Sequence, residues 1–323
     1  MSVLLCVGTA GMSVWFSRDL GETWTRPYIE SGLYLEARVW ALSAHPARPG
    51  EVFAGTDSGI YRWSEATRLW THLPSPLDGL HVWSLVQSPD DPDVLLAGTH
   101  PAGIWRSTDG ARSWTPCAAR FAETCVFLGR PRVTQILYDP LQRETVWAGV
   151  EIDGVHRSTD GGRTWAKIGQ GLLSDDIHGV AVVPEDGRRR LFATTNKGLH
   201  LSLDDGATWT MQPLDSPWQY TRTIVPRADG EGTVFLTNGD GPPGSTGRLL
   251  RSADRGRSWQ DARLPGALNS TPWTIATHPA DPSLMFVCSN LGQLFRSTDG
   301  GASWTRLARE FGEVRSTLWQ PLG

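Results

Sequence analysis

Histidine and carboxylate side chains recur at matching places in several β-rich segments of this 323-residue chain. Asp176 lies two residues before His178, while His81 and Glu313 stand at the corresponding places in other segments. A histidine beside a carboxylate can act as a general base or, with more partners, as a metal ligand. We therefore take these four residues as the catalytic candidates. The same four are candidate ligands of a divalent metal, although the sequence requires no cofactor and predicts no definite metal site.

Arginine and aromatic side chains occupy the remaining matching places. Arginine offers planar, bidentate recognition of a carboxylate or phosphate, and indole or phenol rings offer a stacking surface for a ring. The predicted substrate-binding residues are Arg38, Arg132, Arg222, Arg315, Tyr220, Trp40, Trp83 and Trp273. This set predicts a small anionic or aromatic ligand.

The positions follow from aligning the β-rich runs on the proline that ends them. Residues six and eight places before that proline share one side of a strand, because side chains alternate with a period of two. In the fifth run the count is ambiguous: counting from the proline selects Trp218 and Tyr220, and counting back from Phe235 replaces Trp218 by Arg222. Loop residues that can also reach this end of the strands are His100, Glu151, Asp153, Asn196, Lys197 and Asn290.

A repeated motif, Ser-x-Asp-x-Gly-x-x-Trp, sets the spacing of these runs. Five full copies begin at Ser17, Ser158, Ser202, Ser252 and Ser297. A sixth copy at Ser107 has Ala111 in place of glycine, and the segment Ser64 to Trp70 is a shortened seventh. Successive copies are 43 to 51 residues apart, so the chain consists of seven near-equal units.

Each unit contains four short β-rich runs separated by turn residues, which is typical of one blade of a β-propeller. The sequence predicts an all-β fold: a single seven-bladed propeller domain over 1–323, built from four-stranded antiparallel blades. The first unit lacks its first run, and the C-terminal segment supplies an extra one. We therefore predict that the last blade combines 312–323 with 1–27, which removes an open sheet edge.

The repeated motif resembles the Asp-box, or BNR, repeat of sialidases, sortilin-type receptors, xyloglucan-degrading glycosidases and a photosystem II assembly factor family. The resemblance covers the whole chain and implies a propeller in which the Asp-box residues are structural. Likeness to sialidases implies an arginine triad with an acid and a nucleophile. However, the chain has no Phe/Tyr-Arg-Ile-Pro segment and has seven units where sialidases usually have six, which argues against sialidase activity itself.

Up-and-down topology separates the two faces of the ring. The Asp-boxes follow the third run of each unit and belong to the bottom face, whereas the first-run starts and the loops between runs two and three belong to the top. The two longest units carry their extra residues in 116–130 and 238–248. Both insertions are predicted on the top face, where long loops are often functional.

Composition excludes several classes of protein. The net charge is −4, and no basic cluster exceeds Arg188 to Arg190, so a nucleic-acid partner is not expected. No apolar run approaches the roughly 18 to 20 residues that span a bilayer, and the start lacks a basic signal-peptide region, which predicts a cytoplasmic protein away from the membrane. Cys6 and Cys288 are expected to be buried thiols, while Cys117 and Cys125 can pair or stay reduced.

Two functions fit these residues. The first is a small-molecule enzyme, a hydrolase or lyase acting on an anionic, carboxylated sugar-like or aromatic substrate in a central top-face pocket. The alternative is a non-catalytic binding or assembly protein that docks a protein partner on this face. Polar side chains that simply face water in the channel would also satisfy the pattern. Arginines that converge on one pocket with the histidines favour the enzyme, and arginines that fan outward favour docking.

Overall fold

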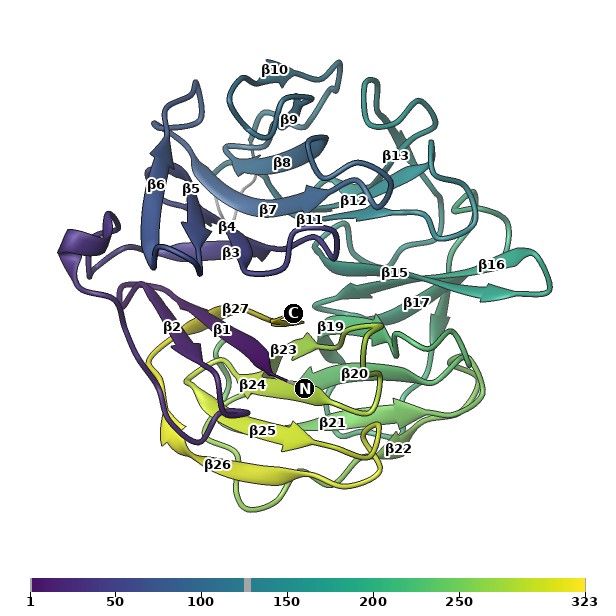
Figure 1. Ribbon diagram of the computed structural model, residues 1–323. Coiled ribbons are helices and arrows are strands. Elements are labelled where there is room, and N and C mark those ends of the chain that lie inside the picture. The colour runs from purple at the N-terminus through teal and green to yellow at the C-terminus, as the bar shows by residue number, and fades with distance from the viewer. Residues whose placement is uncertain (1, 125–128, 323) are drawn as a thin grey trace.

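The computed structural model describes residues 2–124 and 129–322 and forms a closed ring of β-sheets (Figure 1). The strands are two to nine residues long because glycine, proline or an Asp-box turn bounds each β-rich run. The predicted all-β, seven-bladed propeller is confirmed. In the described residues the only helix is the 3-10 turn η1 (Ile29–Ser31).

The first three blades follow the chain in order, with all strands antiparallel. Blade 1 contains β3 (Val39–Ser43), β4 (Glu51–Thr56), β5 (Gly59–Ser64) and β6 (Leu69–Leu73). Blade 2 contains β7 (His81–Gln87), β8 (Leu95–His100), β9 (Ile104–Ser107) and β10 (Thr115–Pro116). Blade 3 contains β11 (Arg132–Tyr138), β12 (Val146–Glu151), β13 (Gly154–Ser158) and β14 (Ala166–Ile168).

The next three blades repeat this order. Blade 4 contains β15 (Ile177–Glu185), β16 (Arg188–Thr195), β17 (Gly198–Ser202) and β18 (Thr210–Gln212). Blade 5 contains β19 (Tyr220–Pro226), β20 (Val234–Gly239), β21 (Gly247–Ser252) and β22 (Gln260–Asp261). Blade 6 contains β23 (Pro272–Ala276), β24 (Met285–Ser289), β25 (Gln293–Ser297) and β26 (Thr305–Glu310).

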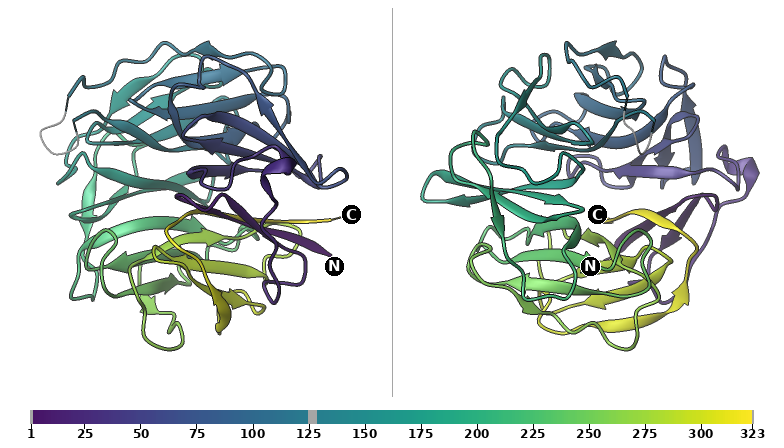
Figure 2. Two further views of the ribbon diagram at one scale, coloured as in Figure 1. Left: turned by 90° about the vertical axis from the view of Figure 1, so that its left-hand side faces the viewer. Right: turned by 180° about the vertical axis from the view of Figure 1, so that it is seen from behind.

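Blade 7 joins the two ends of the chain, as the sequence predicts. Strand β27 (Val314–Pro321) pairs with β1 (Val3–Thr9), which pairs with β2 (Val14–Ser17). The fourth strand is reduced to one antiparallel bridge between Phe16 and Thr25. Both chain ends therefore lie side by side near the centre of the ring (Figures 1 and 2).

The hydrophobic core is divided into layers between neighbouring blades. Phe16 of blade 7 stacks on Trp63 of blade 1 with ring centroids 4.5 Å apart, and both are almost fully buried. Phe53 and Leu95 fill the next layer, between blades 1 and 2. Burial of such side chains on both faces of each sheet is what holds the ring together.

The Asp-box is a self-contained turn, and the copy at Ser158 shows why its residue types are needed. Ser158 Oγ donates to Asp160 Oδ1 at 2.7 Å, and the backbone N–H of Thr164 donates to the same oxygen at 2.9 Å. Gly162 has φ of +86°, a conformation that favours glycine, and its carbonyl accepts the Trp165 indole N–H at 2.9 Å. The Asp-box residues therefore stabilise their own turn. Each Asp-box turn lies at the end of its blade opposite the start of the first strand.

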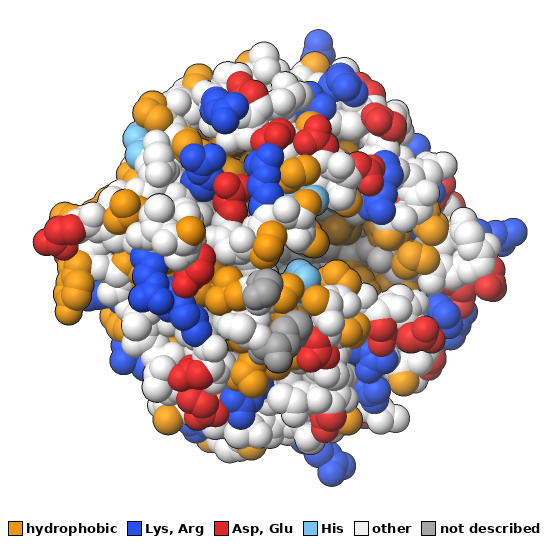
Figure 3. Space-filling view, in the orientation of Figure 1, with side chains coloured by type: hydrophobic (Ala, Val, Ile, Leu, Met, Phe, Trp, Pro, Cys, Tyr) orange, Lys and Arg blue, Asp and Glu red, His pale blue; other side chains and the backbone are white. Residues whose placement is uncertain are grey.

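The surface shows no segregation of charge on the face drawn in Figure 3, where acidic and basic side chains are interspersed around a central hollow. In residues 2–124 and 129–322, no helix is long and apolar enough to cross a bilayer.

Cys6 and Cys288 are fully buried, and burial raises the pKa of the Cys288 thiol to about 11. The predicted alternatives for Cys117 and Cys125 involve residue 125, which lies outside the described residues.

Candidate functional site

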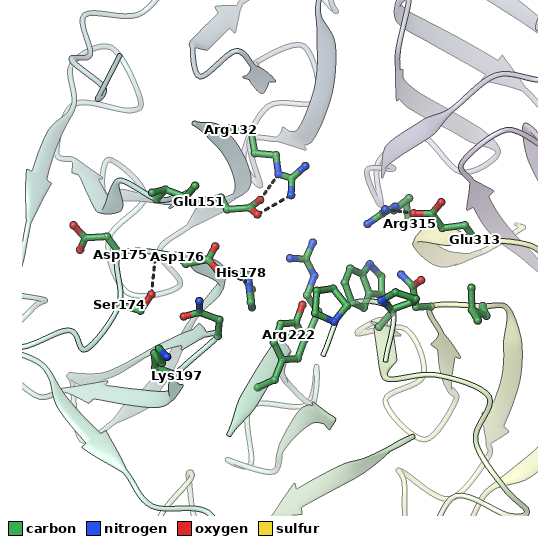
Figure 4. A pocket seen from close by; sticks show the side chains of 18 residues that line it. Arg132, Glu151, Ser174, Asp175, Asp176, His178, Lys197, Arg222, Glu313 and Arg315 are labelled. Carbon is green, nitrogen blue, oxygen red and sulfur yellow. Dashed lines mark hydrogen bonds and ion pairs between the residues drawn. The ribbon is translucent and has the colours of Figure 1, made fainter. Parts of the chain in front are cut away.

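A cavity of about 800 Å³ opens at the end of the ring where the first strands begin. It is bounded by blades 3 to 7, and Figure 4 shows its lining side chains. Those side chains come from first-strand starts and from the connections between second and third strands, which is the face that up-and-down topology assigns to a pocket. The lining residues are Arg132, Glu151, Ile152, Ser174, Asp175, Asp176, His178, Asn196, Lys197, Tyr220, Arg222, Pro242, Pro243, Trp273, Asn290, Leu291, Glu313 and Arg315.

The first strand of every blade contains a β-bulge, and in blades 4 to 7 a residue at the bulge lines the cavity. At each bulge the pairing register with the second strand skips one residue, or two in blade 5. Bulges bend a strand and re-aim its side chains, and they are frequent beside functional sites. The skipped residues are Trp40, Trp83, Thr134, His178, Arg222 with Thr223, Trp273 and Arg315.

Blade 5 resolves the ambiguity in the sequence alignment. Its bulge lies between Thr221 and Ile224, so Arg222 occupies the place that His178 holds in blade 4. Tyr220 also lines the cavity, whereas Trp218 lies outside it and contacts Arg248 at 5.7 Å. The count that starts from Phe235 therefore gives the correct register.

Indole rings support the guanidinium groups of the cavity. Trp40 and Trp83 stack on each other with ring centroids 4.4 Å apart, and the Arg132 guanidinium lies 4.1 Å from the Trp83 ring. On the other side, Arg222 lies 4.3 Å from the Trp273 ring, and Arg315 is 5.4 Å from the same ring. Such contacts orient a planar guanidinium without neutralising its charge.

Two of the arginines carry a carboxylate partner. Arg132 forms a two-pronged ion pair with Glu151, in which Nη2 donates to Oε1 at 2.7 Å and Nε also contacts the carboxylate. Arg315 contacts Glu313 through Nη2. Glu151 is only 6% exposed, and such a buried carboxylate needs a partner of opposite charge.

His178 and Asp176 lie next to each other in the cavity. His178 Nε2 is 3.4 Å from Asp176 Oδ2, and Nδ1 is 2.7 Å from the Thr221 carbonyl oxygen. Burial raises the pKa of Asp176, but the His178 hydrogen bond and the positive charges of His178, Arg222 and Arg132 outweigh it and lower the pKa. Asp176 is therefore a carboxylate at neutral pH, and its Oδ1 has no hydrogen-bond partner among the described residues.

Burial also shifts two groups that face this pair. Tyr220 packs on His178 with ring centroids 4.8 Å apart, and burial followed by the charge of Asp176 raises the pKa of its phenol to about 12. Burial, and then the like charges of Arg222 and Arg132, lower the pKa of Arg315 to about 9. Tyr220 is therefore neutral and Arg315 charged at pH 7.

The structure brings together eight of the twelve predicted site residues. The eight that line the cavity are Arg132, Asp176, His178, Tyr220, Arg222, Trp273, Glu313 and Arg315. Trp40 and Trp83 lie behind them, as supports for Arg132 and Arg315. His81 stacks on Trp40 at 5.9 Å, and Arg38 is exposed beside its backbone bridge to Ala10, so neither lines the cavity.

The four candidate metal ligands do not form one group. His178 pairs with Asp176, Glu313 pairs with Arg315, and His81 lies in blade 2. Within residues 2–124 and 129–322, no three His, Cys, Asp or Glu side chains are arranged to hold a metal ion. The arrangement supports acid–base chemistry and anion binding.

The loops add residues that strand alignment cannot identify. Ser174 and Asp175 precede β15, and Pro242 and Pro243 come from the insertion between β20 and β21. Glu151, Asn196, Lys197 and Asn290 line the cavity from the expected loops, whereas His100 and Asp153 do not. Of the two insertions, 238–248 reaches the cavity, while no described residue of 116–130 lines it.

Comparison with known proteins places the chain among propellers. No protein-family model matches it. A xyloglucanase from a Paenibacillus species is 26% identical over 306 residues, which cover 79% of this chain and 30% of that protein, so this chain spans about a third of the relative's length. The crystal structure of a GH74 enzyme from Niastella koreensis superposes with a TM-score of 0.65 at 20% identity, covering 83% of this chain and 45% of that one.

A second solved structure, YCF48 bound to D1 peptide, superposes with a TM-score of 0.57 at 14% identity and covers 84% of this chain and 81% of that chain. At these identities the structural likeness shows the fold alone. These comparisons therefore agree with the β-propeller fold of this chain.

Proposed function

We propose that this chain is a hydrolase that acts on a carboxylated, sugar-like substrate bound in the central cavity. The observation that carries the proposal is convergence: Arg132, Arg222 and Arg315 point into one cavity that also holds the His178–Asp176 pair (Figure 4). The Paenibacillus relative, a xyloglucanase by name, supports hydrolysis of a carbohydrate. The arginines support a negatively charged group on the substrate, in which this chain would differ from a protein acting on neutral xyloglucan.

We assign the acid and the base of the reaction from the contacts of His178 and Asp176. The Thr221 carbonyl can only accept, so His178 Nδ1 donates to it at 2.7 Å, and Nε2, 3.4 Å from Asp176 Oδ2, is the ring nitrogen left to exchange a proton. In this proposal His178 Nε2 is the atom that passes a proton to the leaving oxygen. Asp176, held ionised, is the carboxylate that activates water or stabilises developing positive charge at the sugar carbon.

Tyr220 and Trp273 form the apolar part of the binding surface. Tyr220 is 9% exposed and Trp273 is 4% exposed, yet both side chains line the cavity. A sugar ring packs its C–H face on such aromatic surfaces, and the surrounding polar groups fix its orientation.

The test is hydrolysis of a matched panel of oligosaccharides, with and without uronic acid residues, and including xyloglucan oligosaccharides. The wild-type chain is expected to release reducing ends from uronate-containing oligosaccharides, and Asp176→Asn is expected to abolish the release without lowering the melting temperature. Cleavage of neutral xyloglucan alone would show that the arginines do not select the substrate. No cleavage of any member would refute hydrolysis of these carbohydrates.

Peptide docking is a second candidate, and the rim of the cavity favours it. Leu291 is 40% exposed and Leu173 is 61% exposed beside the charged interior, a pattern that suits an extended peptide with a terminal carboxylate. The solved YCF48 structure is of a propeller with a bound peptide. Micromolar binding of C-terminal peptides together with inactivity on the oligosaccharide panel would favour this function over hydrolysis.

A further inference from the structure

The cavity has balanced charge, which limits the ligand it can hold. Four basic side chains, Arg132, Lys197, Arg222 and Arg315, face the same space as four acidic ones, Glu151, Asp175, Asp176 and Glu313. A doubly charged phosphate would meet repulsion from Glu151, Asp176 and Glu313, whereas Asp175 is already paired with Lys167 Nζ at 2.9 Å. A single carboxylate needs only one unpaired guanidinium.

Arg222 is that guanidinium. Arg132 is neutralised by Glu151 and Arg315 contacts Glu313, whereas the side chain of Arg222 has neither an ion pair nor a hydrogen bond to any described residue. Its guanidinium lies 4.3 Å from the Trp273 ring, which fixes its plane. The bulge in β19 places it in the ring of residues that face the channel.

The neighbours of Arg222 define what an anion there would touch. Its charge lowers the pKa of Asp176 on one side and of Arg315 on the other, so it lies within electrostatic reach of both. Arg222 lines the same cavity as the His178–Asp176 pair and Arg315, so an anion bound to Arg222 shares that space with all three. Arg315 Nε is buried with no hydrogen-bond partner among the described residues.

We propose that Arg222, backed by Trp273, binds the one carboxylate of a monoanionic ligand of the uronic acid class, and that Glu313 masks Arg315 so that a second anionic group is refused. The inference rests on the proposed function only in placing a ligand in the same cavity. It makes Arg222 the residue that selects an acid over the matching neutral sugar, and it assigns Arg132 a supporting part as the partner of Glu151.

The experiment is calorimetric titration of the full chain with three matched probes: D-galacturonate, D-galactose and D-galactose 6-phosphate. The wild type is expected to bind galacturonate most tightly. Arg222→Gln should weaken galacturonate roughly tenfold or more, as expected for loss of a charged hydrogen-bonding partner, and leave galactose unchanged. Glu313→Gln should act in the opposite direction, tightening galacturonate and admitting the phosphate, because it unmasks Arg315.

Two variants keep the result interpretable. Arg222→Lys retains the charge but not the planar fork, and should recover part of the affinity that Arg222→Gln loses. Arg38→Gln, at an exposed arginine outside the cavity lining, removes a positive charge elsewhere and should leave the preference for galacturonate intact.

Three outcomes would overturn the inference: equal affinity for galacturonate and galactose in the wild type, unchanged affinity in Arg222→Gln, or tighter binding of the phosphate than of the carboxylate. Galacturonate binding that depends on Arg222 without any cleavage of uronate oligosaccharides would uphold the inference and refute the hydrolase. Cleavage that persists in Arg222→Gln with an unchanged KM would uphold the hydrolase and refute the inference about Arg222.

Discussion

His178 and Asp176 face each other across the start of β15, with Nε2 3.4 Å from Oδ2, while the opposite ring nitrogen of His178 meets the Thr221 carbonyl of the next blade at 2.7 Å. One imidazole thus connects the first strands of blades 4 and 5. Contacts on both sides fix the orientation of the ring. The bulge between Ile177 and Gly179 turns it toward the cavity.

Replacing His178 should remove turnover, and replacing His81 should not. His178→Gln is expected to lower kcat roughly 100-fold or more on any substrate that the chain cleaves, since general acid catalysis contributes about that much. His81→Gln serves as the control, because His81 stacks on Trp40 outside the cavity lining. Steady-state kinetics with melting curves measure both effects. A similar loss of kcat in both variants would contradict the assignment.

Activity should persist into mildly acidic solution. The folded-state pKa of Asp176 is lower than the ordinary 3.8, because the His178 hydrogen bond and nearby positive charges oppose the effect of burial. The carboxylate is then present above pH 4 and is lost only as pH falls through the lowered pKa. The pH profile of kcat/KM for the wild type is expected to show no inflection from this group between pH 4 and 6. Loss of activity between those values with the fold intact would contradict an ionised Asp176.

The Asp-box aspartates should make the fold sensitive to strong acid. Hydrogen bonds from Thr164 and Ser158 lower the pKa of Asp160 to about 2 against the effect of partial burial, compared with 3.8 when unfolded. The resulting stability is fully present above pH 4 and is lost as pH falls toward 2. Asp160→Asn is expected to lose about 1 kcal/mol at pH 7, as for other side-chain caps of backbone N–H groups, and to show a shallower loss of stability below pH 4.

Asp215→Asn is the control for that experiment. Asp215 is exposed, and its side chain has no hydrogen bond to any described residue. Chemical denaturation at pH 7, 4 and 3 should therefore give wild-type behaviour for Asp215→Asn. Equal behaviour of the two variants would show that the Asp-box hydrogen bonds do not stabilise the ring.

Removing 314–323 should prevent stable folding. This segment contains β27, which pairs with β1 from Val3 to Thr9 and supplies Arg315 to the cavity. Without it, β1 becomes an exposed edge and the buried Trp319 is lost from the core. Circular dichroism during heating should show no cooperative transition, whereas removal of 322–323 alone should preserve one. An unchanged melting temperature after the longer truncation would contradict closure through blade 7.

The repeat predicts the fold well because its Asp-box turns recur every 43 to 51 residues and leave room for four strands each. The face of the site is also readable from up-and-down topology. The bulges are not, because the residue that a bulge skips depends on pairing with the neighbouring strand. That is why the sequence left Trp218 and Arg222 as alternatives in blade 5.

Charge pairing within the site is likewise a property of the folded ring. Arg132 and Glu151 are 19 residues apart and meet because β11 and β12 pair with these two residues in register. Arg38 and His81 satisfy the same sequence pattern as Arg132 and Asp176, yet blades 1 and 2 contribute none of the residues lining the cavity. The stacked Trp40 and Trp83 fill that side of the ring instead.

A crystal structure of the chain soaked with D-galacturonate would test the central claim most directly. The account predicts the sugar in the central cavity, with its carboxylate on the Arg222 guanidinium over Trp273 and its anomeric oxygen within hydrogen-bond reach of His178. Galacturonate bound elsewhere, or bound in the cavity with its carboxylate turned away from Arg222, would contradict it.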